Sequence, residues 1–190
     1  MIAIADEARA ASKHAVERLH DLSVSRVVML TGGNEGTARV IAEQVGIDEY
    51  RAELLPDEKV SAIESLQTEH GDVATVGDGI SDAPALATAE VGVAMGAAGT
   101  DTALETADIA LMGDDIGKLP YLYALARKAN DVIRRNILVS LGVKALLAIG
   151  VPIGLVTVAV AVVVGDMGMS LGVTGNAMRL SRLKPADLFA

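Results

Sequence analysis

A long apolar stretch constrains the fold of this 190-residue chain more than any other feature of its sequence. From Ile137 to Met178 the only charged residues are Lys144 and Asp166. The stretch is about twice as long as the roughly 20 residues that cross a bilayer once. The run from Gly150 to Gly154 interrupts it with Gly and Pro, which break helices. We therefore expect two transmembrane helices; the alternative, a buried hairpin of a soluble protein, does not suit so long an apolar stretch.

Basic residues flank this stretch on both sides, whereas the turn in its middle has no charge. Before it stand Arg127, Lys128, Arg134 and Arg135, and after it stand Arg179, Arg182 and Lys184. Because the cytoplasmic ends of membrane helices carry an excess of Lys and Arg, both ends of the chain are expected in the cytoplasm. The sequence thus predicts a multi-pass protein of the cell membrane, in contact with lipid.

The charges are divided unequally along the chain. Residues 1–132 hold 10 Lys and Arg against 23 Asp and Glu, and residues 133–190 hold 6 against 2. So acidic a first part repels nucleic acid and suits a solvated cytoplasmic domain. The chain has no cysteine, which excludes disulfides and thiolate metal sites within it.

The residues before the apolar stretch alternate short apolar runs with helical patterns, which is typical of a Rossmann-like α/β fold with a parallel sheet. The expected strands are 27–30, 73–76, 91–95 and 109–112. The expected helices are about 6–20, 36–45, 57–69, 82–89 and 101–106, with a last helix from about 116 toward the membrane.

Two loops of this predicted sheet carry residues suited to phosphate chemistry, because ligands of open α/β sheets bind beyond the carboxyl ends of the strands. The loop from Thr31 to Asn34 offers a hydroxyl and two glycines, which let backbone N–H groups approach a phosphate beside a helix N-terminus. A simple glycine turn is the alternative for this loop.

The second loop, from Gly77 to Asp82, places the carboxylates of Asp78 and Asp82 at a strand-to-helix junction. Hard oxygen ligands of this kind suit Mg²⁺ held beside a phosphate. Helix capping is the alternative for Asp82 alone. Lys59, near the start of a predicted helix, supplies a positive charge for the same pocket, although a lone lysine in such a place is usually exposed to solvent.

Taken in order, these segments resemble the haloacid dehalogenase-like phosphorylation domain of P-type ATPases. That domain has a TGD loop, a P-x-x-K lysine and a GDGxNDxPAL loop. The matching segments here are Thr31-Gly32, Pro56 to Lys59 and Gly77 to Leu86. The resemblance extends over nearly the whole chain.

The resemblance implies a role for each matching residue. Thr31 and Gly32 would bind the transferred phosphoryl group, Lys59 would neutralise its charge, and Asp78 would hold Mg²⁺ with support from Asp82. It also implies ATP, bound mainly by a nucleotide-binding domain that these 190 residues do not contain.

The sequence departs from the family pattern at three points. No DKTGT motif occurs, so the aspartate that the family phosphorylates is absent from this chain. Gly33 stands where the family has Asp, and Ser81 stands where it usually has Asn. We therefore expect that the chain cannot run the covalent cycle by itself.

The two charges of the apolar stretch need a reason, because a charge at the centre of a bilayer costs about 2.5–3.5 kcal/mol on insertion scales. A structural ion pair and a transport site are both open for Lys144 and Asp166. Their surroundings resemble the last two membrane helices of the zinc, cadmium and lead exporting class of P-type ATPases. In that class the aspartate is a ligand of the transported cation and the lysine is a built-in counter-ion.

The resemblance also assigns the parts of the chain. They are a partial phosphorylation domain (1–115), a stalk helix (116–136), two transmembrane helices (137–180, with spans at about 137–151 and 155–178) and a cytoplasmic tail (181–190). The expected function is ATP-driven export of Zn²⁺, Cd²⁺ or Pb²⁺, as a fragment or half of a pump whose other chain carries DKTGT. The alternative is an inactive, membrane-anchored Mg²⁺- or phosphate-binding protein derived from such a pump.

Overall fold

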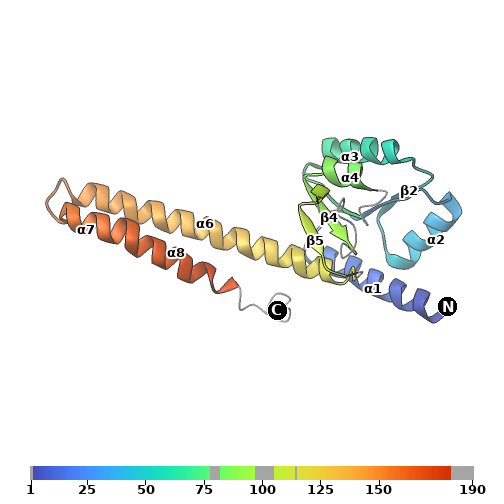
Figure 1. Ribbon diagram of the computed structural model, residues 1–190, viewed down its shortest axis with the longest axis horizontal. Coiled ribbons are helices and arrows are strands. Elements are labelled where there is room, and N and C mark those ends of the chain that lie inside the picture. The colour runs from blue at the N-terminus through green and yellow to red at the C-terminus, as the bar shows by residue number, and fades with distance from the viewer. Residues whose placement is uncertain (1, 78–81, 97–104, 114, 181–190) are drawn as a thin grey trace. The chain divides into compact units, whose positions relative to one another are not determined.

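The computed structural model describes residues 2–77, 82–96, 105–113 and 115–180 (Figure 1). The chain divides into two compact units, Met1–Pro120 and Tyr121–Ala190. The first unit alternates short strands with helices, and the second is a helical hairpin.

The elements of the first unit follow the order expected of an α/β domain. They are α1 (Ile2–Asp21), β1 (Val28–Leu30), α2 (Glu35–Val45), β2 (Glu49–Arg51), α3 (Pro56–His70), β3 (Ala74–Gly77), α4 (Ala83–Thr88), β4 (Val91–Met95) and β5 (Ile109–Leu111). The predicted helix at 101–106 lies mostly outside the described residues.

All strand pairs in the described part of the first unit are parallel, which confirms the predicted fold class. β1 pairs with β2, with Val28 opposite Glu49. A second sheet has the order β3-β4-β5, with Val93 between Val76 and Ile109. Within these ranges β1, β2, β3 and β5 each pair along one edge only.

The sequence pattern did not predict β2. Its residues Glu49, Tyr50 and Arg51 form no apolar run, and period-based analysis depends on such runs. Pairing with β1 holds the strand instead, and the Glu49 carboxylate accepts hydrogen bonds from Arg26 at 3.0 Å and from Arg51 at 3.1 Å. Tertiary contacts rather than local pattern therefore define this strand.

The core of the first unit lies where α3 and α4 pack against each other and α4 packs on β4. Ile63, Leu86 and Val93 have almost no exposed surface. Gly92 allows the close approach of α4, because a Cβ there would lie 2.6 Å from the backbone carbonyl oxygen of Leu86. The Gln67 amide also donates to the Thr88 carbonyl at 2.9 Å, which ties α3 to the end of α4.

A carboxylate joins three further segments of this unit. Oδ2 of Asp48, just before β2, accepts a hydrogen bond from the Val27 backbone N–H at 2.7 Å and lies 2.9 Å from Nε2 of His20 in α1. The Val27 N–H lowers the pKa of Asp48, and the hydrogen bond and charge of His20 lower it further. The ionised carboxylate therefore stabilises this corner.

The second unit consists of two helical arms joined by a turn (Figure 1). The first arm is α6 (Lys118–Gly150), and the second contains α7 (Val158–Val162), the π-helix η1 (Val163–Gly168) and α8 (Met169–Ala177). In the turn, Gly154 has φ +76°, a value that glycine adopts without strain. By length and composition, one described stretch, Val158–Ala177, could cross a membrane.

A seam of half-buried and buried residues runs along the hairpin. On α6 it includes Asn136, Ser140, Leu147 and Gly150, and on the second arm Gly165, Met169, Val173 and Asn176. Asn176 closes the seam at its open end, because its side-chain amide donates to Oδ1 of Asn136 at 2.7 Å. Many other side chains are apolar and exposed, such as Leu138 and Leu171, so the hairpin offers an apolar surface to its surroundings.

Candidate functional site

Lys59 and Asp82 form an ion pair at the carboxyl end of β3. Nζ of Lys59 lies 2.6 Å from Oδ1 of Asp82, and the side chains are only 16% and 23% exposed. The expectation that Lys59 is exposed to solvent is therefore wrong. Asp82 does occupy the N-cap position of α4, as the capping alternative has it, but its side chain makes no cap hydrogen bond there and pairs with Lys59 instead.

Local sequence explains how each partner is positioned. Pro56 stands in the first turn of α3, where a missing N–H costs nothing, and the Glu58 carboxylate accepts a hydrogen bond from the Leu55 N–H at 2.8 Å. These features fix the helix start that carries Lys59. Gly77 ends β3, and a Cβ there would lie 2.8 Å from Oδ2 of Asp82, so only glycine leaves room for this carboxylate.

The loop that leaves β1 is a well-formed turn. Thr31 Oγ1 accepts a hydrogen bond from the Gly33 N–H at 3.0 Å, and Asn34 caps α2 by accepting from the Thr37 N–H at 2.8 Å. The segment after β2 holds the loop, since the Leu54 N–H donates to the Thr31 carbonyl at 3.1 Å. The turn alternative thus accounts for the geometry, and phosphate binding by Thr31 and Gly32 stays a prediction.

The magnesium site lies partly outside the described residues. Asp78 and Ser81 both fall within residues 78–81, which the structure does not describe, so the Mg²⁺ role of Asp78 stays a prediction. Where the structure describes side chains, no three His, Cys, Asp or Glu residues are grouped to hold a metal. Asp82 has a carboxylate of the type that Mg²⁺ prefers, and Lys59 holds one of its oxygens.

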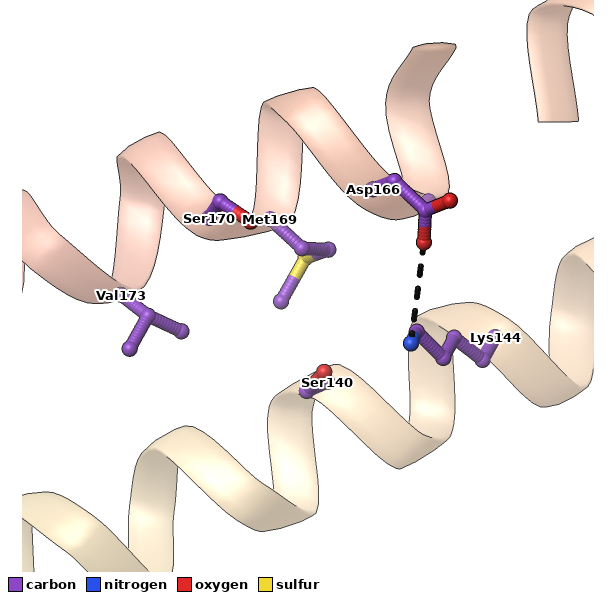
Figure 2. Close-up of a pocket in the computed structure, with 7 residues that line it drawn as sticks. Ser140, Lys144, Asp166, Met169, Ser170 and Val173 are labelled. Carbon is purple, nitrogen blue, oxygen red and sulfur yellow. Dashed lines mark ion pairs between the residues drawn. The ribbon is translucent and has the colours of Figure 1, made fainter. Parts of the chain in front are cut away.

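A second ion pair occupies the hairpin. Nζ of Lys144 on α6 lies 3.8 Å from Oδ1 of Asp166 in η1 (Figure 2). The pair borders a hollow of about 170 Å³, lined by Ser140, Lys144, Gly165, Asp166, Met169, Ser170 and Val173. In this chain the side chains of Lys144 and Asp166 are 56% and 71% exposed, so the hairpin does not enclose them. The structure thus brings the two charges together, as an ion pair requires.

Sequence reasoning did not predict the local geometry of Asp166. The residue lies in a π-helix. This conformation is rare in proteins, but where it occurs it is often at a functional site. Gly165 beside it is buried, and a Cβ there would lie 3.2 Å from Cδ1 of Leu147 on α6. The Gly165-Asp166-Met167-Gly168 sequence is a signal for this close approach of the two arms, but Ser140, Met169 and Ser170 carried no motif.

Comparisons with known proteins agree with this architecture. The haloacid dehalogenase-like hydrolase family matches residues 1–90. The probable cadmium-transporting ATPase of Listeria monocytogenes is 50% identical over 184 residues, which are 97% of this chain and 26% of the relative. The zinc-exporting P-type ATPase of Mycobacterium marinum is 44% identical over 185 residues, 97% of this chain and 25% of the relative.

A solved structure gives the same result. The crystal structure of a zinc-transporting PIB-type ATPase in the E2.Pi state matches with a TM-score of 0.79 and 42% identity, over 88% of this chain and 27% of that one.

The parallel sheet and the ion pair at its edge therefore define a haloacid dehalogenase-like α/β domain. The whole chain, hairpin included, is similar to heavy-metal-transporting P-type ATPases, over 97% of its length in sequence and 88% in structure. It spans about a quarter of the length of the relatives that it matches.

Proposed function

We propose that this chain takes part in ATP-driven export of divalent heavy-metal cations, Zn²⁺, Cd²⁺ or Pb²⁺, as one portion of a P-type ATPase. The observation that carries the proposal is the Lys144–Asp166 pair on an apolar hairpin. Charged residues inside a membrane are rare and mark ion pathways, and an aspartate beside a lysine is a ligand with its own counter-ion. Relatives that match over 97% of the chain are named as cadmium- and zinc-transporting pumps.

The first unit would supply part of the phosphoryl-transfer site. Thr31 and Gly32 would bind the transferred phosphoryl group, and Lys59 would neutralise its charge while Asp82 keeps the ammonium in place. Asp78, with Asp82, would hold Mg²⁺, which offsets charge on the phosphate oxygens. ATP itself would bind mainly to a nucleotide-binding domain outside these 190 residues.

The phosphorylated aspartate would come from a DKTGT segment, which does not occur in this sequence. In the described residues, β1 and β3 each have one unpaired edge. Unpaired strand edges are templates for a further strand, and a strand supplied by the rest of the pump, on the same or a separate chain, would join there. α6 and the Val158–Ala177 stretch would both span the cell membrane, with both termini in the cytoplasm.

Co-expression tests this proposal. The chain is expressed with a polypeptide that supplies the DKTGT half, in cells sensitive to zinc and cadmium, and metal tolerance and ATP hydrolysis are measured. We expect both to rise, and the Asp166→Asn variant to lose metal-stimulated hydrolysis. No gain with an expressed, membrane-inserted partner would refute the split-pump form of the proposal.

A second candidate function is a membrane-anchored protein that binds Mg²⁺ or phosphate without turnover. The Thr31 loop favours it, because Gly33 has no carboxylate and its N–H is engaged by the Thr31 hydroxyl. Calorimetry on the full chain in detergent, with Mg²⁺ and inorganic phosphate, discriminates the two. Binding that persists when the DKTGT half is present, without any hydrolysis, supports this second function.

A further inference from the structure

Asp166 is not the only side chain with a potential metal-ligand atom at the hollow of the hairpin. Figure 2 shows Met169 and Ser170 on the same arm as Asp166, with Ser140 on α6 across from them. Together they offer a carboxylate, a thioether and two hydroxyls around one open space. This set of donors is richer than the ion pair alone.

Met169 occupies a distinctive position among the methionines of this arm. It is half-buried and lies on the seam between Gly165 and Val173. Figure 2 shows its side chain directed toward α6. Met167 and Met178, by contrast, are 67% and 61% exposed. Of these three thioethers, only that of Met169 lies on the seam facing α6.

Asp166, Met169 and Ser170 lie where the π-helix passes into α8. The Met169 N–H donates to the carbonyl of Val164, five residues earlier, which is the hydrogen bond of a π-turn, and also to that of Asp166. Residues three and four apart lie on one face of a helix. Met169 and Ser170 stand three and four positions after Asp166, so all three side chains line the same hollow.

The chemistry of these donors differs in a way that matters for metal choice. Carboxylate and hydroxyl oxygens are hard ligands that suit Mg²⁺ and Mn²⁺, whereas a thioether sulfur is soft and suits polarisable cations. The chain contains no cysteine, so a methionine is the softest ligand that it can offer. A thioether beside a carboxylate favours Cd²⁺ over harder divalent ions.

We propose that Met169 is a specificity-determining residue of the cation site: its Sγ coordinates the transported cation beside the Asp166 carboxylate and shifts preference toward Cd²⁺. The inference rests on the proposed transport role of Asp166. Lys144 pairs with that carboxylate when no cation is bound, and its exposed side chain is free to withdraw when a divalent ion arrives.

The absence of cysteine makes the test direct, since any sulfur atom bound to a metal in this chain must belong to a methionine. The full chain is placed in lipid nanodiscs, and Cd²⁺ alone is added below one equivalent. X-ray absorption at the cadmium edge then reports whether sulfur lies in the first coordination shell. Titrations with Cd²⁺ alone and Mn²⁺ alone give the two affinities.

Three variants separate the possible outcomes. Met169→Leu keeps the volume of the side chain and removes the sulfur, and Met178→Leu is the matched control on the same arm. We expect sulfur around cadmium in the wild type and in Met178→Leu but not in Met169→Leu, with Cd²⁺ affinity lowered about tenfold and Mn²⁺ affinity unchanged. Asp166→Asn should weaken both metals.

The results distinguish this inference from the proposed function. If Asp166→Asn weakens binding but the wild type shows no sulfur around cadmium, or Met169→Leu weakens Cd²⁺ and Mn²⁺ equally, the role of Met169 is refuted and that of Asp166 stands. If Asp166→Asn leaves both affinities unchanged, or the wild type binds no Cd²⁺, the cation site itself is refuted.

Discussion

The ammonium of Lys59 lies 2.6 Å from the carboxylate of Asp82, although 23 positions separate the two residues in the chain. The pair connects the start of α3 with the start of α4 at the end of β3. It keeps a positive charge at the carboxyl end of β3. Removing one partner of such a part-buried pair leaves the other charge uncompensated.

Removing one partner of this pair should destabilise the first unit. We expect Lys59→Met to lower its free energy of unfolding by about 1–3 kcal/mol, because the Asp82 carboxylate then loses a charged hydrogen-bond partner. Urea unfolding of the full chain in detergent, followed by circular dichroism, measures the loss. Lys13→Met, at an exposed position of α1, is the matched control.

A double-mutant cycle sharpens this test. Lys59→Met combined with Asp82→Leu removes both charges, so the combined loss should be smaller than the sum of the single losses. Strictly additive losses would contradict a direct pair.

Gly92 should tolerate no side chain. We expect Gly92→Ala to cost about 1–3 kcal/mol, because its Cβ would meet the backbone carbonyl oxygen of Leu86 at 2.6 Å, and backbone cannot rotate away. The same urea experiment measures it. Gly36→Ala is the control: its Cβ would have 3.5 Å to the nearest atom, and alanine in a helix adds up to about 1 kcal/mol. Equal stability of Gly92→Ala and wild type would refute the close approach of α4 and β4.

The Asp48 corner should make stability depend on pH. Hydrogen bonds from Val27 and His20 lower the pKa of Asp48 in the folded state below the ordinary value of an aspartate. The stabilisation is therefore present above the unfolded pKa and is lost as the pH falls through the folded pKa. We expect unfolding midpoints of the wild type to fall below about pH 4 more steeply than those of Asp48→Asn. Glu43→Gln, at an exposed position of α2, should keep the wild-type slope.

The hydrogen bond between Asn136 and Asn176 should hold the open end of the hairpin. Interhelical hydrogen bonds of membrane proteins contribute about 0.6 kcal/mol on average, so Asn176→Ala should destabilise the hairpin by roughly this amount. Detergent titration of the chain from mild micelles into SDS measures the change. A cycle with Asn136→Ala should show coupling between the two sites, and independent effects would argue against the bond.

The sequence allowed the fold class to be predicted because strands and helices of the first unit mostly carry their own periodic patterns. It failed for β2, whose residues Glu49 to Arg51 have no such pattern and become a strand only by pairing with β1. Local patterns also favoured a solvent-exposed Lys59, which is wrong. The exposure of a side chain depends on neighbours that come from distant parts of the chain. Asp78 and Ser81, on which the Mg²⁺ prediction depends, lie outside the described residues.

By itself, the sequence determined the apolar stretch with its two charges, the absence of cysteine and the motifs that identify the family, since these depend only on residue types and spacing. Only the tertiary structure decided that Lys59 meets Asp82 and that Asp166 and Met169 face Ser140 of α6 across one hollow. The physical reason is that a contact across distant segments depends on packing and on small changes of helical phase. Local preferences along the chain encode neither the ion pair nor the hollow.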